Sequence, residues 1–185
     1  MNYTLLLTGK MRAGKDEFAK LMLKLDPSLR RMAFADQLKA YSAGILGIPV
    51  EDLHDAEKKK LYRDRLIFGG NLVRVIAPHT WADHVYFSSE YRDNNVIITD
   101  ARYQNEIDNG KFAAQGTNRR VFVVRIEASD EVRQQRGAAS EFEKDISETS
   151  LDNYPYDVRI RNEGTVEDLE KQAQGFYNYY IYGKN

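Results

Sequence analysis

The sequence predicts an α/β fold built on a mainly parallel sheet. Short apolar, β-branched runs alternate along the chain with longer segments in which apolar residues recur every three or four positions. One such run, Val96 to Thr99, is β-branched at every position, as in a strand that is buried on both faces. A glycine-containing loop separates the first strand-like run, Tyr3 to Thr8, from the first helical segment. This alternation is typical of parallel strands joined by crossover helices.

The expected strands follow one another along the whole chain. They are Tyr3–Thr8, Arg31–Phe34, Val96–Thr99, Val121–Ile126 and Val158–Arg161. The first helix between them has the apolar face Phe18, Leu21, Met22 and Leu25. For the second helix we expect Asp36 as N-cap and a stop at Gly47 and Pro49. Its apolar face is predicted to be Leu38, Tyr41 and Ile45.

Later helices are recognised mainly by their ends. The segment Glu57 to Ala77 is helical in pattern but is expected to be interrupted at Gly69-Gly70. Two helices are expected to begin with capping boxes, Thr80 with Asp83 and Thr165 with Asp168. A short helix between them is predicted to start at Ser129 as N-cap and to end before Gly137 at C′. The last helix has the apolar face Val166, Leu169, Ala173, Phe176 and Tyr180.

Length and composition restrict the possible functions. A chain of 185 residues without internal repeats or linkers suits one domain, so we expect residues 1–185 to form a single unit. The net charge of −1 provides no global basic field, and we expect no binding to polymeric nucleic acid. The chain has no cysteine, which excludes disulfides, thiolate metal sites and thiol catalysis, and its three histidines lack the spacing of a metal site.

The same reading bears on where the protein works. No apolar run approaches the ~18 residues that a membrane span needs. Residues 1–7 lead straight into a strand-like run without the basic and then apolar regions of a signal peptide. We therefore expect a cytoplasmic protein without a membrane partner.

The loop after the first strand carries the most specific motif. It reads Gly9-Lys10-Met11-Arg12-Ala13-Gly14-Lys15-Asp16 and matches the phosphate-binding spacing G-x-x-x-x-G-K. Glycines let the backbone curl until its N–H groups point inward at phosphate oxygens, and the N-terminus of the next helix adds partial positive charge there. A lysine after the second glycine supplies a movable charge for the β- and γ-phosphates of ATP. Because the match lies between an apolar strand and an amphipathic helix, we interpret it as a phosphate loop.

Asp16 stands where such loops usually have Ser or Thr. A carboxylate beside a triphosphate is repelled unless a cation bridges the two, so Asp16 indicates Mg²⁺ bound directly or through water. The alternative is a favourable interaction with the helix dipole, and both can hold at once. Lys10 and Arg12 add two cations to the loop, which a second anionic substrate close by would explain.

A second candidate cluster follows the strand Val96–Thr99. Asp100 is placed to hold a Mg²⁺-bound water, and Arg102 to clamp a phosphate with its two-pronged guanidinium group. Asn105 and Glu106 come next and can reach the hydroxyls or base of an acceptor.

Several other side chains have two readings. Lys39, Arg65 and Arg74 either contact the acceptor or are solvated surface charges. Arg133 and Arg136 lie three residues apart on one helix face, where they either close over the transferred phosphoryl group or face water. Trp81 either offers a flat surface to a base or packs in the core. The tyrosines at 177, 179, 180 and 182 indicate helix packing or a subunit interface, so a homodimer is one possible assembly.

Taken together, the segments resemble the deoxynucleoside monophosphate kinases of bacteriophages and, more distantly, the animal-type phosphomevalonate kinases. The resemblance rests on the phosphate loop with its Gly-Lys-Asp ending and on four further segments. These are Phe34-Ala35-Asp36-Gln37-Leu38-Lys39, the stretch with Arg65, Gly70, Arg74 and Trp81, Asp100-Ala101-Arg102-Tyr103-Gln104-Asn105-Glu106, and residues 157–165, Asp-Val-Arg-Ile-Arg-Asn-Glu-Gly-Thr.

Membership of this group would imply a three-layer P-loop NTPase fold with a central, mainly parallel five-stranded sheet, helices on both faces and a small mobile lid. It would place the monophosphate-binding region at about residues 36–90 and the lid at about 129–150, and Asn162 beside the adenine of ATP. The nucleotide-binding residues would be Arg12, Ala13, Gly14, Lys15, Asp16, Glu17, Arg133 and Asn162, and the metal ligands Asp16 and Asp100. Acceptor contacts would come from Lys10, Lys39, Arg65, Arg74, Trp81, Arg102 and Glu106.

The sequence thus predicts phosphoryl transfer from Mg²⁺-ATP to a nucleoside monophosphate, with Lys15, Asp100, Arg102, Arg133 and Arg136 as the catalytic residues. Two alternatives stay open. One is a P-loop kinase for a non-nucleotide phosphate such as phosphomevalonate. The other is a nucleotide-binding regulatory module that does not catalyse transfer.

Overall fold

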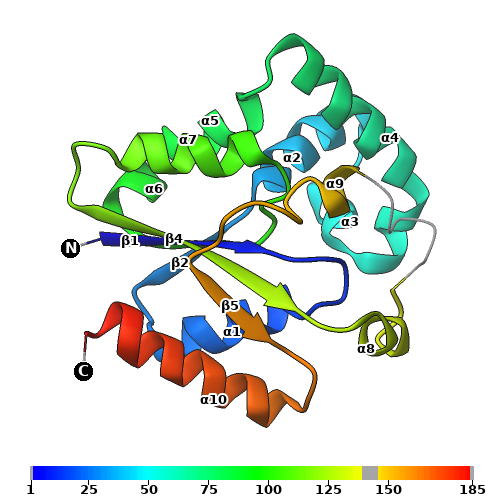
Figure 1. Cartoon of the computed structure of the whole chain (residues 1–185). Coiled ribbons are helices and arrows are strands. Elements are labelled where there is room, and N and C mark those ends of the chain that lie inside the picture. Colours follow the sequence, from blue (N-terminus) through cyan, green and yellow to red (C-terminus); the bar gives the residue numbers. More distant parts are fainter. Residues whose placement is uncertain (1, 139–145, 184–185) are drawn as a thin grey trace.

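The computed structural model describes residues 2–138 and 146–183 (Figure 1). Its centre is a sheet of five parallel strands in the order β2-β3-β1-β4-β5. The strands are β1 (Asn2–Thr8), β2 (Leu29–Met32), β3 (Asn95–Ile98), β4 (Arg119–Glu127) and β5 (Val158–Arg161). Because all five run the same way, their carboxyl ends share one edge of the sheet, called here the carboxyl edge. The predicted fold class is confirmed.

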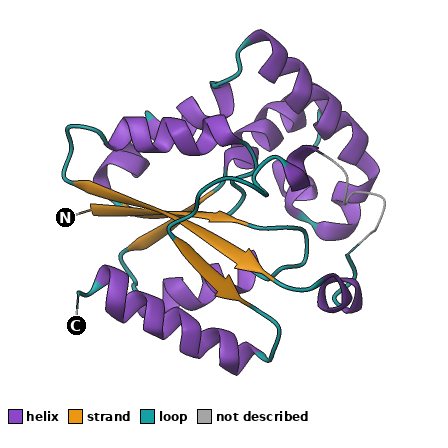
Figure 2. Ribbon diagram, in the orientation of Figure 1, coloured by secondary structure: helices purple, strands orange, loops and turns teal. Residues whose placement is uncertain are grey.

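Helices cover both faces of the sheet, as Figure 2 shows. One face carries α1 (Lys15–Leu25) and α10 (Val166–Phe176), which continues as a π-helical turn η2 (Tyr177–Ile181). The other face carries α2 (Phe34–Leu46), α5 (Thr80–Tyr86), α6 (Ser89–Asp93) and α7 (Gln104–Ala114). Farther out lie α3 (Val50–His54) and α4 (Ala56–Ile76), while α8 (Asp130–Gln135) and α9 (Ile146–Thr149) lie near the carboxyl edge. Within the described residues no helix is long and apolar enough to cross a membrane.

Alternation along the buried strands divides the interior into two cores. Leu5 and Leu7 of β1 point toward α1 and α10, where they pack with Phe18, Met22 and Phe176. Leu6, between them, points to the opposite face and packs with Phe34, Trp81 and Ile107. A central strand buried on both faces needs apolar residues at successive positions, which explains the continuous run Leu5-Leu6-Leu7.

The second predicted strand is shifted by two residues, and the helix after it begins earlier than expected. The strand is Leu29–Met32, and α2 starts at Phe34 with Ala33 at the N-cap, so Asp36 does not cap it. The cap comes from far along the chain: the Asp100 carboxylate accepts hydrogen bonds from the Phe34 and Ala35 amides, both at 2.9 Å. No local signal reveals a cap that is supplied by another strand.

The earlier start accompanies a different buried face of α2. The buried residues are Phe34, Lys39 and Ala43, whereas Tyr41 is 49% exposed and Ile45 is 87% exposed. The prediction of an apolar face at Leu38, Tyr41 and Ile45 was therefore wrong except for the partly buried Leu38.

Helix α4 is continuous through Gly69-Gly70, so the predicted interruption is also wrong. Gly70 is needed for close packing, since a Cβ there would lie 3.0 Å from a methyl carbon of Leu38. Its carbonyl accepts the indole N–H of Trp81 at 3.3 Å. A glycine that lets a neighbouring helix approach need not end its own helix.

Other helix ends are as predicted. Ser129 caps α8, with Gly137 in a left-handed conformation after it, and Thr165 with Asp168 forms the capping box of α10. The exception is α5, whose N-cap is His79 without a side-chain cap bond, so the capping box predicted from Thr80 with Asp83 is wrong.

Two glycines provide a test of this backbone description. Gly9 has φ 139°, and a Cβ there would lie 2.2 Å from the Ile126 carbonyl oxygen, so Gly9→Ala should lower the free energy of unfolding by roughly 2 kcal/mol or more. Gly44, inside α2, has open space around its Cα, and Gly44→Ala should raise stability by about 0.5–1 kcal/mol. Urea unfolding of both variants measures the difference. Equal effects would contradict the close approach at Gly9.

Candidate active site

The phosphate loop joins β1 to α1 at the carboxyl edge (Figure 1). Three of its residues have positive φ, namely Gly9 at 139°, Arg12 at 62° and Gly14 at 102°. Left-handed residues turn successive N–H groups toward one side, which creates an anion-binding concavity. A non-glycine residue in this region, such as the exposed Arg12, is uncommon and is found mostly at functional turns. The loop therefore has the backbone shape that its sequence predicts.

Asn162 holds this loop against the end of β5. Its side-chain amide donates to the Ala13 carbonyl oxygen at 2.9 Å, and its own N–H donates to the Glu127 carbonyl oxygen at 2.7 Å. Gly14 leaves no room for a side chain, because a Cβ there would lie 2.1 Å from Asn162 Nδ2. Asn162 is buried, and its side-chain hydrogen bond connects the phosphate loop to the loop that follows β5.

Lys15 lies beneath the loop at the start of α1. Its Nζ donates to the carbonyl oxygens of Gly9 at 2.6 Å and Lys10 at 3.0 Å. Burial and, after it, the positive charge of Arg102 lower the pKa of Lys15 to about 8, although the nearby Glu148 and Asp16 carboxylates oppose the shift. A lysine with this pKa carries a full charge at pH 7 and is poised to give up its proton just above it.

Asp100 lies two residues after β3, and its side chain links the end of that strand to the N-terminus of α2. Both of its oxygens accept backbone N–H groups, as described above, and burial raises its pKa although those two amides lower it. A carboxylate oxygen accepts more than one hydrogen bond, so Asp100 can still accept one from a metal-bound water.

Arg102 and Glu148 connect this strand to the phosphate loop. Arg102 Nη1 donates to a Glu148 oxygen, and the other Glu148 oxygen accepts the Met11 N–H at 2.6 Å. Arg102 also donates to Ser147 Oγ at 3.2 Å. The Glu148 side chain is only 4% exposed, whereas that of Arg102 is 37% exposed. Burial lowers the pKa of Arg102, but the charge and hydrogen bond of Glu148, together with the charges of Asp100 and Glu106, outweigh it and raise that pKa above its ordinary value.

Glu106 organises the next turn. Its Oε2 accepts the N–H groups of Arg102 at 2.8 Å and Tyr103 at 3.0 Å, and its Oε1 lies 3.5 Å from Arg74 Nη2. Burial raises the pKa of Glu106 to about 7, with Asp100 adding to the shift and the two amides opposing it. The Arg74 guanidinium lies over the Tyr103 ring, 4.4 Å from its centroid. Glu106 thus fixes the backbone that presents Arg102 and also holds Arg74 in place.

A group of cations faces the same region from α2 and α4. Lys39 is buried and donates to Asp36 at 3.2 Å, with His54 Nδ1 at 3.3 Å. Lys39 lies in the second turn of α2, which begins at Phe34, and it is not the solvated surface charge of its second interpretation. Lys59 is an exposed residue, yet burial of its ammonium group lowers its pKa, and three neighbouring cations lower it further: Lys39, Arg102 and Arg63. Mutual repulsion of this kind marks a place where an anion would be stabilised.

The two arginines of the proposed lid lie on α8 and the turn after it. Arg133 is buried and donates to Asp130 at 2.6 Å and to the Met11 carbonyl oxygen at 3.4 Å. Arg136 donates to the carbonyl oxygens of Asn162 at 3.1 Å and Gly164 at 3.4 Å. Arg133 therefore lies against the phosphate loop and Arg136 against the loop after β5. Of the lid range 129–150, residues 139–145 lie outside the described residues.

Other predicted site residues are placed elsewhere or stay at the margin. Trp81 is 3% exposed and packs in the core, the second of its two readings. Arg65 is exposed and lies over Tyr62 rather than beside Arg102. Glu17 pairs with Lys20 at 3.1 Å on the outer side of α1, so only its backbone N–H remains a candidate for phosphate contact. Lys10 lies near Asp130, whose pKa its charge helps to lower.

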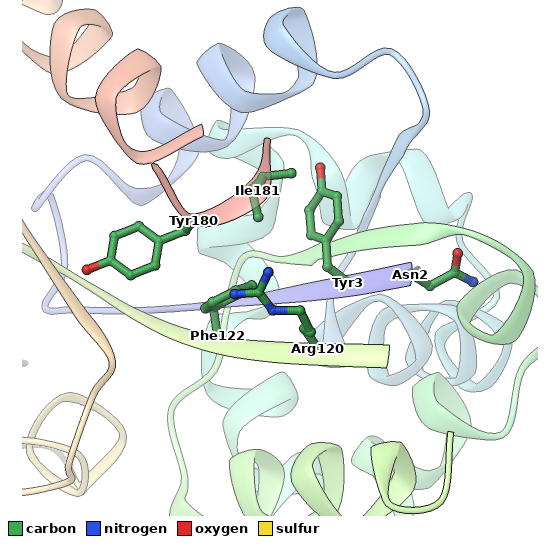
Figure 3. Close-up of a pocket in the computed structure, with 6 residues that line it drawn as sticks. All are labelled: Asn2, Tyr3, Arg120, Phe122, Tyr180 and Ile181. Carbon is green, nitrogen blue, oxygen red and sulfur yellow. The ribbon is translucent and has the colours of Figure 1, made fainter. Parts of the chain in front are cut away.

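The small pocket drawn in Figure 3 does not belong to this site. It is lined by Asn2, Tyr3, Arg120, Phe122, Tyr180 and Ile181, at the amino ends of β1 and β4. The phosphate loop lies at the other end of β1, so the chemistry has to be sought at the carboxyl edge.

Sequence reasoning missed Glu148, Lys59 and Arg63. Lys59 lies in a run of three lysines, and such a run is typical of a solvent-exposed surface. A signal was nevertheless present, because positions 59, 63 and 74 share one face of a helix at 3.6 residues per turn. Glu148 lies in a polar stretch without a periodic pattern, and only the fold brings it to the phosphate loop.

Comparisons with known proteins agree with the fold. No family model matches the chain, and no curated protein sequence matches it. Solved structures do: shikimate kinase from Aquifex aeolicus superposes with a TM-score of 0.54 at 16% identity, covering 98% of this chain and 99% of that one. TT1252 from Thermus thermophilus superposes with a TM-score of 0.57 at 15% identity, covering 97% of this chain and 98% of that one. APS kinase CysC from Mycobacterium tuberculosis, in complex with AMPPNP and APS, superposes with a TM-score of 0.51 at 13% identity, covering 96% of each chain.

The chain shares the overall fold of these structures, a parallel five-stranded sheet with helices on both faces. At these identities the resemblance is one of fold alone, and the roles of individual residues have to come from the geometry of the site.

The lowered pKa of Lys15 leads to a test that needs no acceptor. Affinity for ADP should fall as the pH is raised from 7 through about 8 to 10, since the deprotonated lysine no longer balances phosphate charge. In Lys15→Arg, which stays charged over this range, the pH dependence should largely disappear. Titration calorimetry in matched buffers measures both. A wild-type affinity that is constant up to pH 10 would show that Lys15 does not contact the phosphates.

Proposed function

We propose that this chain is an ATP-dependent kinase that transfers the γ-phosphoryl group to a nucleoside monophosphate, a deoxynucleotide in the first instance, to give the diphosphate. The observation that carries the proposal is a meeting of two sets of cations at the carboxyl edge. Lys15 belongs to the phosphate loop, and its pKa is lowered by burial and then by Arg102, which Glu148 links to the Met11 amide of the same loop. Arg102 in turn lowers the pKa of Lys59 on the opposite side, so both sets act on one region.

The phosphate loop supplies the donor half of the site. The first amides of α1 have no acceptor within the helix and, with those of the loop, suit the β- and γ-phosphates of ATP. Gly9 and Gly14 let the loop lie against the Ile126 carbonyl and the Asn162 side chain, where a Cβ would clash. Arg133 lies against this loop and Arg136 beside Asn162, which favours phosphate and adenine contacts respectively.

The donor set also fits a magnesium ion. Mg²⁺ in ATP sites is typically held by one or two carboxylates together with phosphate oxygens. Asp16 beside Lys15 and Asp100 at the end of β3 are such a pair, with Asp100 acting through water because its oxygens already accept two amides. When bound, the ion would neutralise charge on the phosphate oxygens as it develops.

The acceptor half has features that favour a nucleotide with a terminal phosphate. Lys39, Lys59 and Arg63 provide positive charge beside Arg102, more than an uncharged acceptor requires. Tyr103 offers an aromatic ring, one face of which is covered by the Arg74 guanidinium. A planar base can stack against such a pair of groups, whereas the acyclic hydroxy-acid chain of phosphomevalonate has no ring to stack.

The chemistry then needs little beyond positioning. An oxygen of the acceptor phosphate forms a bond to the γ-phosphorus while the bond from that phosphorus to the β–γ bridging oxygen breaks, and ADP leaves. The attacking oxygen is already anionic at neutral pH, so no general base has to remove a proton. Lys15 and Arg102 would balance the charge on the transferred group, and Arg133 of α8, which contacts the Met11 carbonyl of the phosphate loop, would assist them.

An ADP-release assay with Mg²⁺-ATP tests the proposal. The acceptors are the four common deoxynucleoside monophosphates, 5-hydroxymethyl-dCMP, the ribonucleotides and phosphomevalonate, and we expect turnover with at least one deoxynucleotide. Lys15→Ala should abolish turnover without changing stability, while Lys24→Ala, an exposed lysine in the last turn of α1, should leave it unchanged.

The other outcomes separate the alternatives. Turnover with phosphomevalonate alone would identify a non-nucleotide kinase. Binding of ATP without turnover on any acceptor would identify a regulatory module, and normal turnover by Lys15→Ala would remove the basis of the assignment.

A further inference from the structure

Helix α4 has an exposed apolar stripe on its outer side. Leu61 is 76% exposed, Phe68 71%, Leu72 49%, Val75 82% and Ile76 77%. The same helix buries Leu66 and Gly70, so its core-facing side is already occupied. We call the five exposed residues the outer stripe.

The spacing of the outer stripe is that of a helix-pairing surface. Positions 61, 68, 72 and 75 step by seven, four and three residues, which is the a/d pattern of a coiled coil over two heptads. An exposed helix in a monomer is expected to be polar on the side that faces water. The stripe therefore points to a second helix as its natural cover.

The size of the stripe agrees with a protein interface. Burial of a side chain of this kind removes on the order of 100 Å² from water, so the five together offer on the order of 500 Å². Monomers rarely expose an apolar patch larger than a few hundred Å². A standard interface buries roughly 800 Å² per partner, of which somewhat more than half is apolar.

We propose that the outer stripe pairs with the outer stripe of a second copy of this chain, antiparallel and about a two-fold axis at Phe68. Such an axis places residue i opposite residue 136 − i, because twice 68 is 136, so Leu61 meets Val75 of the second copy. Leu61 and Val75 thus form an apolar pair at each end, with the two Phe68 rings at the centre, while Leu72 and Ile76 lie opposite Asp64 and Lys60 and cover the flanks of the pair. Phe68 is the expected hot spot.

The pairing would also serve the proposed active site, although the inference does not depend on it. Lys59 and Arg63 lie on a different side of α4, which faces Arg102. A partner helix along the outer stripe would support α4 on one side while Lys59 and Arg63 bind an anion on the other.

Sedimentation equilibrium of the full chain tests the pairing, and we expect a dimer. Phe68→Glu should weaken it by at least roughly thirtyfold, as for an interface hot spot. Phe112→Glu is the matched control, because Phe112 on α7 is 72% exposed, as Phe68 is 71%, and lies outside the stripe. A wild-type chain that is monomeric at its highest soluble concentration overturns the proposal, as does a dimer that survives Phe68→Glu.

Cross-linking tests the geometry, because the chain has no cysteine and each introduced one is unique. With a short bis-maleimide, Phe68→Cys should give covalent dimers, and so should a mixture of Leu61→Cys and Val75→Cys chains. Leu61→Cys alone should not, since its two copies would lie about 21 Å apart along the axis. The reverse result would show parallel pairing. Wild-type chains that bind phosphatidylserine vesicles as monomers through Phe68 would show that the stripe meets lipid instead.

An independent observation concerns Glu148, whose carboxylate takes hydrogen-bond donors that suit a phosphoryl group. One oxygen accepts the Met11 N–H of the phosphate loop, and the other accepts Arg102. Backbone amides of such loops and two-pronged guanidinium groups are the usual partners of phosphate oxygens. Carboxylate and phosphoryl oxygens compete for the same donors, because both are anionic acceptors.

Charge makes simultaneous occupation costly. The Glu148 carboxylate raises the pKa of Lys15 against the effects of burial and Arg102, so all three groups interact. A phosphoryl group on the same donors would lie beside the carboxylate, where two like charges in a partly buried site repel each other strongly. A triphosphate that reaches Lys15 and Arg102 would meet that cost for as long as Glu148 stays in place.

We infer that Glu148 is a built-in phosphate surrogate that positions Arg102 and the phosphate loop and is displaced when phosphates bind. This inference concerns the phosphate-binding part of the proposed function. The carboxylate keeps Arg102 and Lys15 from repelling each other and satisfies a loop amide. Phosphoryl oxygens then replace it on the same donors.

Calorimetry with Mg²⁺-free tripolyphosphate tests the exchange. Glu148→Gln removes the competing charge, so tripolyphosphate should bind at least about fivefold more tightly, while the melting temperature of the protein alone should fall. Glu148→Asp keeps the charge with a shorter reach and should restore much of the stability without the gain in affinity. Glu131→Gln, an exposed residue of α8, controls for net charge.

Unchanged or weaker binding by Glu148→Gln would show that the carboxylate stays in place and is not a surrogate. The outcome of the ADP-release assay does not depend on this result. If tighter tripolyphosphate binding is found in a chain without turnover, the surrogate role stands and the kinase assignment falls.

Discussion

The site depends on the close approach of the phosphate loop to the carboxyl edge of the sheet. Gly9 lies against the Ile126 carbonyl of β4, and Gly14 lies against the Asn162 amide that follows β5. Neither position has room for a Cβ, so two strands on one side of β1 determine the curvature of the loop. From that curvature follow the direction of its amides, the position of Lys15 beneath it and the contact of Met11 with Glu148. The loop is shaped by the sheet as much as by its own sequence.

Positively and negatively charged side chains alternate around this loop. Lys15 and Arg102 are separated by Glu148, and Asp100 and Glu106 are each held by two backbone amides rather than by a cation alone. Amides satisfy a buried carboxylate without cancelling the field of a nearby arginine. The arrangement keeps the cations available to an anion while each acidic group has hydrogen-bond partners, as burial requires.

Local patterns were sufficient for some features and not for others. The five strands, the phosphate loop and the caps at Ser129 and Thr165 follow from runs of a few residues, and the structure has them. The buried face of α2 was missed because its cap, Asp100, comes from another strand. The continuity of α4 was missed because Gly70 serves its contact with Leu38. Lys59 was missed because a run of lysines looks the same whether it faces water or a substrate.

The two outer strands of the sheet have a consequence for solubility. Strands β2 and β5 form its edges, each is four residues long, and each carries two arginines: Arg30 and Arg31, and Arg159 and Arg161. Short, charged edges discourage the strand-to-strand addition that leads to aggregation, because like charges would have to be stacked against each other. The sheet is thereby protected from growth at both sides, and the chain can tolerate exposed apolar helix surface without offering neighbouring molecules a template for β-structure.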